Sequence, residues 1–189
     1  MEYDWEHRVN TTSGSVAWRE RLLGVFHSPY QPTDATLFQE MMARLPIDFS
    51  EFTFVDLGSG KGRTLLMASE YPFRRIVGVE ILPDLHWVAV ENIRAYTSPT
   101  QRCLQVESVC ANAREFELPG GPLVLYLFNP LPEVGLMQLL LSLERSLRQH
   151  PRSVYVLYQN PLLSHVLEGS TSLKCTGGTQ QYSIHANAE

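Results

Sequence analysis

A glycine-rich loop and a later glutamate are the residues of this chain whose types and spacing best suit ligand binding. The loop follows a short β-rich run, Phe52–Asp56, and its glycines are Gly58, Gly60 and Gly62. Missing side chains let a backbone approach a ligand closely. Glu80 ends the next β-rich run, at about the spacing at which α/β folds place an acid on a ribose. The pattern therefore predicts a nucleoside held from two sides.

The residues around the glycines distinguish between nucleotide cofactors. Dinucleotide-binding loops follow the pattern GxGxxG, which would require a glycine where Arg63 stands, and the GxxxxGK[ST] pattern of phosphate-binding loops is absent. Asp56 lies just before the loop. A diphosphate favours bare N–H groups without a nearby carboxylate, whereas a sulfonium with an amino-acid ammonium tolerates or favours one. The loop therefore favours S-adenosylmethionine over NAD.

Alternating strands and helices are expected to position these residues. The expected strands are Phe52–Asp56, Arg75–Glu80, 104–110, Leu123–Phe128 and Ser153–Tyr158. Helices are expected at Thr64–Glu70, after Pro83, at 134–148 and at Leu162–Leu167, and a turn at Thr176–Thr179 separates two more short β-like runs. Such alternation predicts an α/β fold, a mostly parallel sheet with helices on both sides.

Two helix faces and an N-terminal extension complete the expected organisation. Thr33 or Asp34 is placed to cap a helix with the apolar stripe Leu37, Phe38, Met41, Met42 and Leu45. The long helix at 134–148 presents Met137, Leu140, Leu141 and Leu147. Residues 1–29 lack sustained periodicity and are predicted to form an arm or lid with one short helix near 16–25. Residues 30–189 are predicted to form the main domain.

Composition and charge exclude several kinds of protein. The chain of 189 residues is long enough to bury a core without disulfides or metal. Its formal net charge of −5 provides no electrostatic footprint for a nucleic acid. Its three cysteines have no metal-ligand spacing and are expected to be reduced thiols. Because no signal peptide and no membrane-length apolar run is recognised, we expect a cytoplasmic protein that binds no metal and no membrane.

The loop and the strand that follows it resemble a known family. The run Val55–Arg63 resembles the first motif of the seven-strand, Rossmann-like methyltransferases, and Gly78-Val79-Glu80 resembles their second motif. The resemblance extends from about Tyr30 to the final hairpin and is closest to small bacterial members of unknown acceptor. It implies a three-layer sandwich with strand order 3-2-1-4-5-7-6 and an antiparallel seventh strand.

The resemblance also implies roles for individual residues. The glycines at 58, 60 and 62, with Ser59 among them, would pass beneath the methionine part and the ribose of the cofactor. Asp56 would contact the methionyl amino group and Glu80 the ribose hydroxyls. Asn112, followed by Ala113, stands where the family usually has an acid for the adenine amino group, and an asparagine can still both accept and donate.

Two further motifs of this family have partial counterparts. Tyr30 and Thr33 resemble a Tyr-x-Pro-Thr motif that closes over the cofactor, although a buried aromatic beside a helix cap is an equal alternative. The run Phe128–Pro132 resembles the Asn-Pro-Pro-Tyr motif of amino-group methyltransferases, but Leu131 interrupts the two prolines and the aromatic residue is absent. Asn129 is therefore expected to line the pocket, to orient the nitrogen that is methylated, or only to end a strand in an Asn-Pro turn.

The main hypothesis is an S-adenosylmethionine-dependent methyltransferase acting on a small molecule or on a protein or other amine nitrogen. Methyl transfer from a sulfonium depends chiefly on positioning, so no catalytic residue is assigned. Lys61 and Arg63 could steer an anionic acceptor or point into solvent. The alternatives are a binding module without turnover and an NAD-binding oxidoreductase. The acceptor and the oligomeric state are left open.

Overall fold

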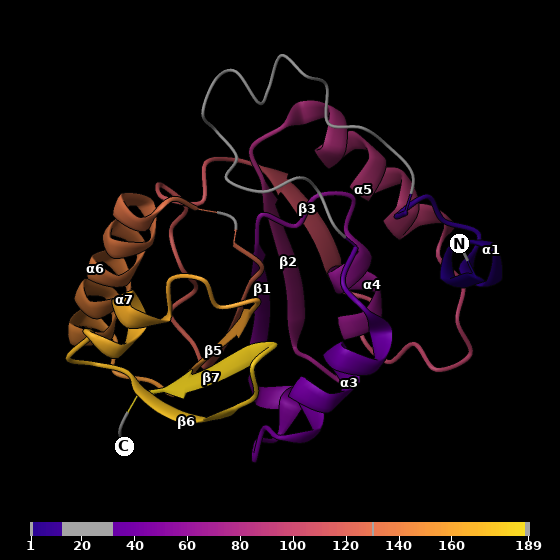
Figure 1. Ribbon diagram of the computed structural model, residues 1–189. Coiled ribbons are helices and arrows are strands. Elements are labelled where there is room, and N and C mark those ends of the chain that lie inside the picture. The colour runs from indigo at the N-terminus through magenta and orange to yellow at the C-terminus, as the bar shows by residue number, and fades with distance from the viewer. Residues whose placement is uncertain (1, 13–31, 130, 188–189) are drawn as a thin grey trace.

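A computed structural model describes residues 2–12, 32–129 and 131–187. Its centre is a seven-stranded sheet with helices on both faces (Figure 1). The strands are β1 (Thr53–Leu57), β2 (Arg75–Glu80), β3 (Val106–Cys110), β4 (Leu123–Leu127), β5 (Val154–Gln159), β6 (Lys174–Gly178) and β7 (Tyr182–Ala186). The helices are α1 (Glu2–His7), α3 (Ala35–Ala43), α4 (Arg63–Ala68), α5 (Pro83–Ala95), α6 (Glu133–Gln149) and α7 (Ser164–Glu168), with a short 3₁₀ turn at Phe49–Glu51.

The strand order is β3-β2-β1-β4-β5-β7-β6. Strands β1 to β5 pair in parallel, and β7 lies antiparallel between β5 and β6. The fold class and the strand order implied by the family resemblance are therefore confirmed. Because the chain leaves β1 toward β2 on one side and returns to β4 on the other, the carboxyl ends of β1 and β4 flank a topological switch point, where open α/β sheets bind ligands.

Each face of the sheet has its own hydrophobic core. Phe54 points to the face covered by α3 and α4, where it packs with Phe38 and Leu65. Its neighbour Val55 points to the opposite face, where α6 and α7 contribute Leu136 and Leu167. Every residue of β1 and β4 is buried, which explains why these strands are almost continuously apolar in the sequence.

Helix α3, which precedes β1, begins and packs as the sequence pattern predicts. The Asp34 side chain accepts a hydrogen bond from Leu37 N at 2.9 Å, so Asp34, and not Thr33, is the N-cap of α3. The predicted stripe is buried through Phe38, Met41 and Met42.

The structure corrects two expectations near the C-terminus. The residues expected to form the hairpin turn, 176–179, mostly belong to β6, because Gly177 and Gly178 pair with Ile184 and Ser183 of β7. The buried face of α6 also differs from the expected one. It consists of Gly135, Leu136, Leu139, Leu140 and Leu143. Met137 and Leu141 remain 50% and 57% exposed, because α6 is apolar around more of its circumference than one sheet face can cover.

The structure adds a helix near the N-terminus. Residues 2–7 form α1, a helix that the sequence pattern did not indicate, and the expected helix near 16–25 lies outside the described residues. The ring of His7 packs on Tyr96 at the end of α5, with ring centroids 5.1 Å apart. The beginning of the predicted arm is thus docked on the main domain.

Candidate functional site

The loop after β1 turns sharply through three glycines in left-handed conformations. The φ angles of Gly58, Gly60 and Gly62 are 90°, 53° and 81°. Gly58 N and Ser59 N both donate to Val79 O, at 2.8 and 3.1 Å, so the loop lies against the end of β2. Gly62 then begins α4, and a Cβ at this position would lie 3.1 Å from the Cβ of Ala89 on α5. The loop therefore needs these glycines for its own shape, before any ligand is considered.

The Glu80 carboxylate contacts this loop directly. Its Oε2 accepts a hydrogen bond from Gly60 N, and its Oε1 accepts one from Leu82 N, each at 2.8 Å. Glu80 is buried, although it is the last residue of β2. The two features that the sequence predicted to face one ligand therefore lie side by side at the same edge of the sheet.

Asp56 adds a second buried carboxyl group to this edge. It is 2% exposed. Burial, together with the smaller effect of the Glu80 charge, raises the pKa of Asp56 to about 8, although a hydrogen bond from the Thr64 side chain opposes the rise. Asp56 is therefore largely protonated at neutral pH, and it would ionise when a cation is placed beside it.

Gly78 and Ser59 interlock beneath the loop. Gly78 pairs with Asp56 across β1 and β2. A Cβ at Gly78 would lie 2.5 Å from Leu65 Cδ1 and 2.6 Å from Ser59 Oγ, so glycine is required here by close packing. Within the described part of the chain, the buried Ser59 Oγ has no hydrogen-bond partner. The sequence placed Gly78 in a motif but gave no reason for it; the reason is this close contact.

An N-terminal segment, residues 3–12, lies against the glycine loop. Asn92 of α5 connects the two. Its Oδ1 accepts from Asn10 N at 2.7 Å, and its Nδ2 donates to Asn10 O at 3.1 Å and to Lys61 O at 2.9 Å. Asn92 is 4% exposed. This buried amide therefore fixes the backbone of the loop and of the N-terminal segment together.

The two basic residues of the loop bind the same N-terminal segment. Lys61 Nζ donates to Asn10 Oδ1 at 3.3 Å. Arg63 Nη1 donates to the hydroxyls of Thr11 and Thr12 at 3.2 and 3.3 Å and lies 3.9 Å from Asp4. Lys61 is buried and the Arg63 side chain is 13% exposed, so the expectation that they point into solvent is wrong, while their steering of an anionic acceptor stays a prediction.

A buried hydrogen-bonded chain crosses the sheet beside Asp56. Tyr126 of β4 pairs with Asp56, and its hydroxyl donates to Gln159 Oε1 at the end of β5. The same hydroxyl lies 2.8 Å from Thr33 Oγ1. Burial raises the pKa of Tyr126, so this hydroxyl stays protonated. Thr33 is thus brought to the site edge, whereas Tyr30 lies outside the described residues.

Asn129 ends β4 in a turn that has a counterpart at the end of β5. Asn129 and Asn160 have φ angles of 46° and 48°, and each precedes a proline and a leucine in the sequence. Asn129 Oδ1 accepts from Tyr158 Oη at 2.7 Å, and its Nδ2 donates to Asn160 O at 2.6 Å. The Asn129 amide thus ties together the two turns. Sequence reasoning missed Asn160, although the repeated Asn-Pro-Leu triplet marks it.

The turn after β3 brings two more of the expected residues to this edge. Ala111 N donates to Glu80 O at 3.0 Å, which places Asn112 and Ala113 beside the end of β2. The Asn112 side chain accepts from Arg114 N and donates to Glu115, so it also shapes its own turn. Ile81, which directly follows Glu80, is 37% exposed at this edge. The sequence analysis did not name it, although an apolar residue directly after the strand-ending acid could have indicated it.

The side chains and helices of residues 2–12, 32–129 and 131–187 bear on metal and membrane binding. In these ranges no group of three or more histidine, cysteine or acidic side chains could hold a metal ion. None of the helices in the same ranges combines the length and the apolarity that crossing a bilayer requires. Cys103 is buried, whereas Cys110 and Cys175 are exposed.

No protein-family model and no curated protein matches the sequence. Solved structures do match. An RNA methyltransferase from Salinibacter ruber, solved in complex with S-adenosyl-L-homocysteine, superposes with a TM-score of 0.54 at 22% identity, over 82% of this chain and 92% of that one. The chain has the fold of the seven-strand methyltransferases.

Two other structures with the methyltransferase fold differ in what they act on. A predicted N6-adenine-specific DNA methylase from Listeria monocytogenes has a TM-score of 0.59 at 15% identity, over 87% of this chain. The mitomycin 7-O-methyltransferase has a TM-score of 0.56 at 16% identity, over 82% of this chain. This chain spans about half the length of each, 53% and 54%. Proteins with this fold thus differ widely in their acceptors.

Proposed function

We propose that this protein is a methyltransferase that binds S-adenosylmethionine at the carboxyl ends of β1 and β2. The hydrogen bond from Gly60 N to the Glu80 carboxylate carries the proposal, because it joins the glycine loop and the acid at one place. A carboxylate can accept about four hydrogen bonds. We propose that Glu80 accepts hydrogen bonds from the two ribose hydroxyls as well as from the backbone.

The other residues at this edge suit the remaining parts of the cofactor. Asp56 supplies a buried carboxyl group that ionises beside the methionyl ammonium. The loop from Gly58 to Gly62, including Ser59, offers backbone at close range, and Asn112 and Ala113 lie beside Glu80 where the adenine would be held. Thr33 and Asn129 are proposed to line the cofactor pocket from the β4 side, with Tyr30 closing it. Residues 1–29 are proposed as the arm and 30–189 as the methyltransferase domain.

When bound, S-adenosylmethionine supplies a methyl group on a sulfonium. The contribution of this chain is to bind and orient, since a well-positioned pair of reactants can gain about 7–11 kcal/mol from proximity alone. The hairpin β6–β7 argues against the NAD alternative, because the dinucleotide-binding fold has six parallel strands in the order 3-2-1-4-5-6.

We propose a small molecule or an amine nitrogen as the acceptor. The formal net charge of −5 favours these acceptors over a nucleic acid, because binding to phosphates requires a basic surface. The test is an acceptor screen with S-adenosylmethionine labelled in its methyl group, with small metabolites, protein extract and RNA in separate arms. Transfer of the label to RNA alone would contradict the proposed class of acceptor. Transfer to none of the three would contradict the proposal that the protein is an active methyltransferase.

Cofactor binding is tested at Glu80. Replacing Glu80→Gln removes one acceptor of a ribose hydroxyl, and a hydrogen bond to a charged group contributes about 1.5–3 kcal/mol. We expect the Kd for S-adenosylhomocysteine, measured by calorimetry, to rise at least about tenfold. The control is Glu91→Gln on α5, because Glu91 is exposed and forms an exposed ion pair with Arg94. An unchanged Kd for Glu80→Gln would remove Glu80 from the site.

A further inference from the structure

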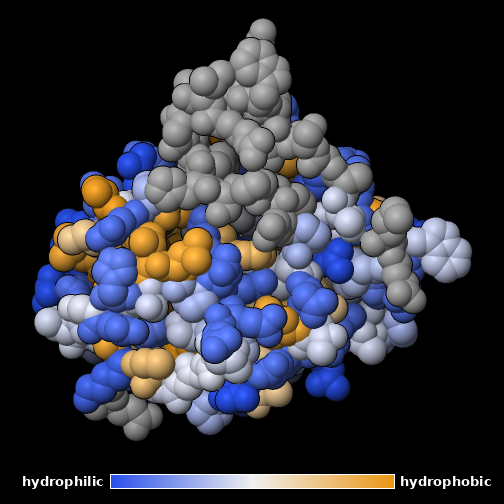
Figure 2. Space-filling model, in the orientation of Figure 1, coloured by the Kyte–Doolittle hydropathy of each residue, from blue (hydrophilic) through white to orange (hydrophobic). Residues whose placement is uncertain are grey.

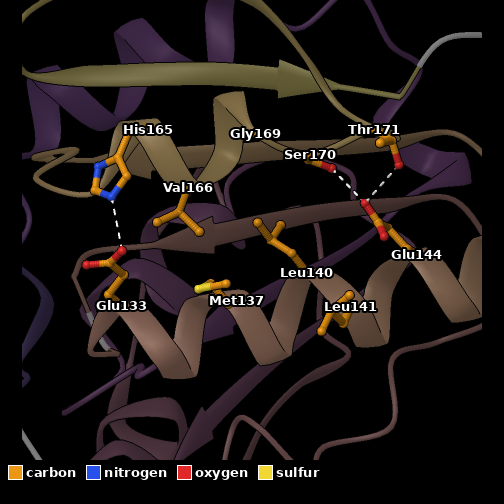
Figure 3. Close-up of a pocket in the computed structure, with 10 residues that line it drawn as sticks. All are labelled: Glu133, Met137, Leu140, Leu141, Glu144, His165, Val166, Gly169, Ser170 and Thr171. Atoms are coloured by element: carbon orange, nitrogen blue, oxygen red, sulfur yellow. Dashed lines mark hydrogen bonds and ion pairs between the residues drawn. The ribbon is translucent and has the colours of Figure 1, made fainter.

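A groove of about 390 Å³ lies between α6 and α7, away from the candidate cofactor site. Its apolar lining comes from Met137, Leu140 and Leu141 of α6 and from Val166 of α7 (Figure 3). Leu140 is buried, but Met137 and Leu141 are half exposed or more. The groove is therefore an apolar channel open to solvent along one side of α6.

Polar contacts close the groove at both ends. At one end His165 Nε2 lies 3.3 Å from Glu133 Oε1. At the other end Glu144 Oε1 accepts from the hydroxyls of Ser170 and Thr171, at 3.1 and 3.4 Å (Figure 3). The apolar part of the groove is thus bounded by two acidic side chains of α6. The buried Leu167 anchors α7 in the core beneath the groove, so the groove is a formed feature of the fold.

The apolar surface extends beyond the groove along α6. Val134 is 65% exposed, and Leu162, which precedes α7, is 68% exposed. Hydrophobic side chains gather on the side of the molecule where Figure 1 draws α6 and α7, as Figure 2 shows. An apolar surface of this kind on a folded protein is typical of an interaction site.

The charges on α6 indicate what can cover this surface. Glu133, Met137, Leu141 and Arg145 follow one another at intervals of four residues, so they form one ridge about 18 Å long on the helix. All four are exposed. The ridge has an acid at its first position, two apolar residues in the middle and a base at its last position. An antiparallel copy of the same ridge is therefore complementary to it.

We propose that two copies of this chain associate through α6, antiparallel, about a two-fold axis between Met137 and Leu141. Glu133 of each copy then faces Arg145 of the other, and Met137 faces Leu141. A parallel arrangement would instead place like charges together. A two-fold contact uses the same patch on both subunits, as this ridge requires. The side chains of each ridge then pack between those of the other, as is ordinary where two helices meet.

The contact is expected to be weak. A stable interface buries about 800 Å² on each partner, and one helix ridge with Val134 and Leu162 beside it is smaller than that. We therefore expect a dimer that dissociates on dilution. Because α6 begins just after the turn at Asn129, association would also fix one wall near the carboxyl end of β4.

Sedimentation equilibrium of the full chain between about 1 µM and 300 µM tests the proposal. We expect a reversible monomer–dimer equilibrium. Glu133→Arg and Arg145→Glu should each weaken association at least about tenfold, because each puts like charges opposite one another. The double substitution should restore association to within about threefold of the unchanged protein, since the pairs are complementary again. Loss of the exposed Glu133–His165 contact is expected to matter little.

Controls separate the ridge from a general effect of charge. Arg94→Glu makes the same change of charge on an exposed residue of α5, outside the proposed interface, and it should leave association unchanged. Met137→Asp should abolish association without lowering the melting temperature, because Met137 is half exposed in the monomer. A protein that stays monomeric at every concentration, or a double substitution that fails to restore a dimer, would overturn the proposal.

Discussion

Asp56 and Glu80 are two buried acids with different surroundings at the same edge of the sheet. Glu80 accepts two backbone hydrogen bonds, from Gly60 and Leu82. The side chain of Asp56 is buried beside Glu80, and burial favours its protonated form. We therefore propose different work for the two carboxyl groups: a fixed acceptor at Glu80 and, at Asp56, an acid that ionises beside a bound cation.

Asp56 leads to a prediction about pH and stability. Its pKa is raised to about 8 in the folded chain, from a model-compound value of 3.8, so the folded state holds a proton that the unfolded state releases. The stabilisation is complete below pH 4 and is lost as the pH rises toward 8, at up to about 1.4 kcal/mol per pH unit. Asp56→Asn should therefore melt higher than the unchanged protein at pH 8, with a smaller difference at pH 5. Thermal melts at several pH values measure this, and a difference independent of pH would contradict it.

The same substitution should have the opposite effect on cofactor binding. Asp56→Asn removes the negative charge expected beside the methionyl ammonium, so the variant gains stability and loses affinity. Calorimetric titration with S-adenosylhomocysteine at pH 8 gives the comparison.

Gly78 is a second position at which a small change should be costly. A Cβ at Gly78 would overlap Leu65 Cδ1 and Ser59 Oγ. Gly78→Ala should lower the free energy of unfolding by about 1–3 kcal/mol, as overpacking of a core does. Gly121→Ala is the matched control, since a Cβ there would meet nothing within 4 Å. Urea denaturation measures both, and equal stabilities of the two variants would be inconsistent with the close packing.

At the scale of elements, α5 connects the glycine loop with the N-terminal segment. Asn92 belongs to α5 and not to the loop. Its side chain nevertheless donates a hydrogen bond to Lys61 O and forms hydrogen bonds with the backbone N–H and C=O of Asn10. The two hydrogen bonds with Asn10 resemble those between residues paired on neighbouring strands, with the Asn92 amide in place of one peptide group. The shape of the loop therefore depends on residues that lie far from it in the sequence.

Asn92→Ala should disturb both stability and cofactor binding. The substitution leaves Lys61 O and Asn10 N without their buried partner, which costs about 1–3 kcal/mol. The affinity for S-adenosylhomocysteine should fall as well, because the loop is held less firmly. Glu91→Ala, on the exposed side of the same helix, is the control for loss of a side chain. A variant that is destabilised but binds with unchanged affinity would show that Asn92 supports the fold and not the loop.

At the scale of the whole molecule, the candidate site lies where five parallel strands end at one edge and the chain reverses its direction across the sheet. A ligand bound there contacts β1, β2 and the turns after β3 and β4 at once. Such a ligand should stabilise the molecule as a unit. At a hundred times its Kd, S-adenosylhomocysteine should add about 2.7 kcal/mol of stability, or roughly 5–10 °C in melting temperature. NAD at the same concentration should cause little shift, and an equal shift with NAD would favour the dinucleotide alternative.

Local pattern was sufficient for most of the fold. The strands β1, β2, β4 and β5 are short apolar runs bounded by polar or glycine residues, and the loop after β1 has a composition that few other structures require. The strand order came from the resemblance of that loop and of Gly78-Val79-Glu80 to a family. Local contacts were also predicted correctly. One example is the cap of α3, in which the Asp34 side chain accepts a hydrogen bond from Leu37 N.

Tertiary packing decided the rest. Whether Lys61 and Arg63 meet solvent, a ligand or the chain itself depends on residues 3–12 folding back over the loop, a contact between segments about fifty residues apart. Which stripe of α6 is buried depends on the face that β4 and β5 offer, since the helix is apolar on more than one side. Periodicity along a chain records that a face is apolar, and only the folded molecule determines what lies against it.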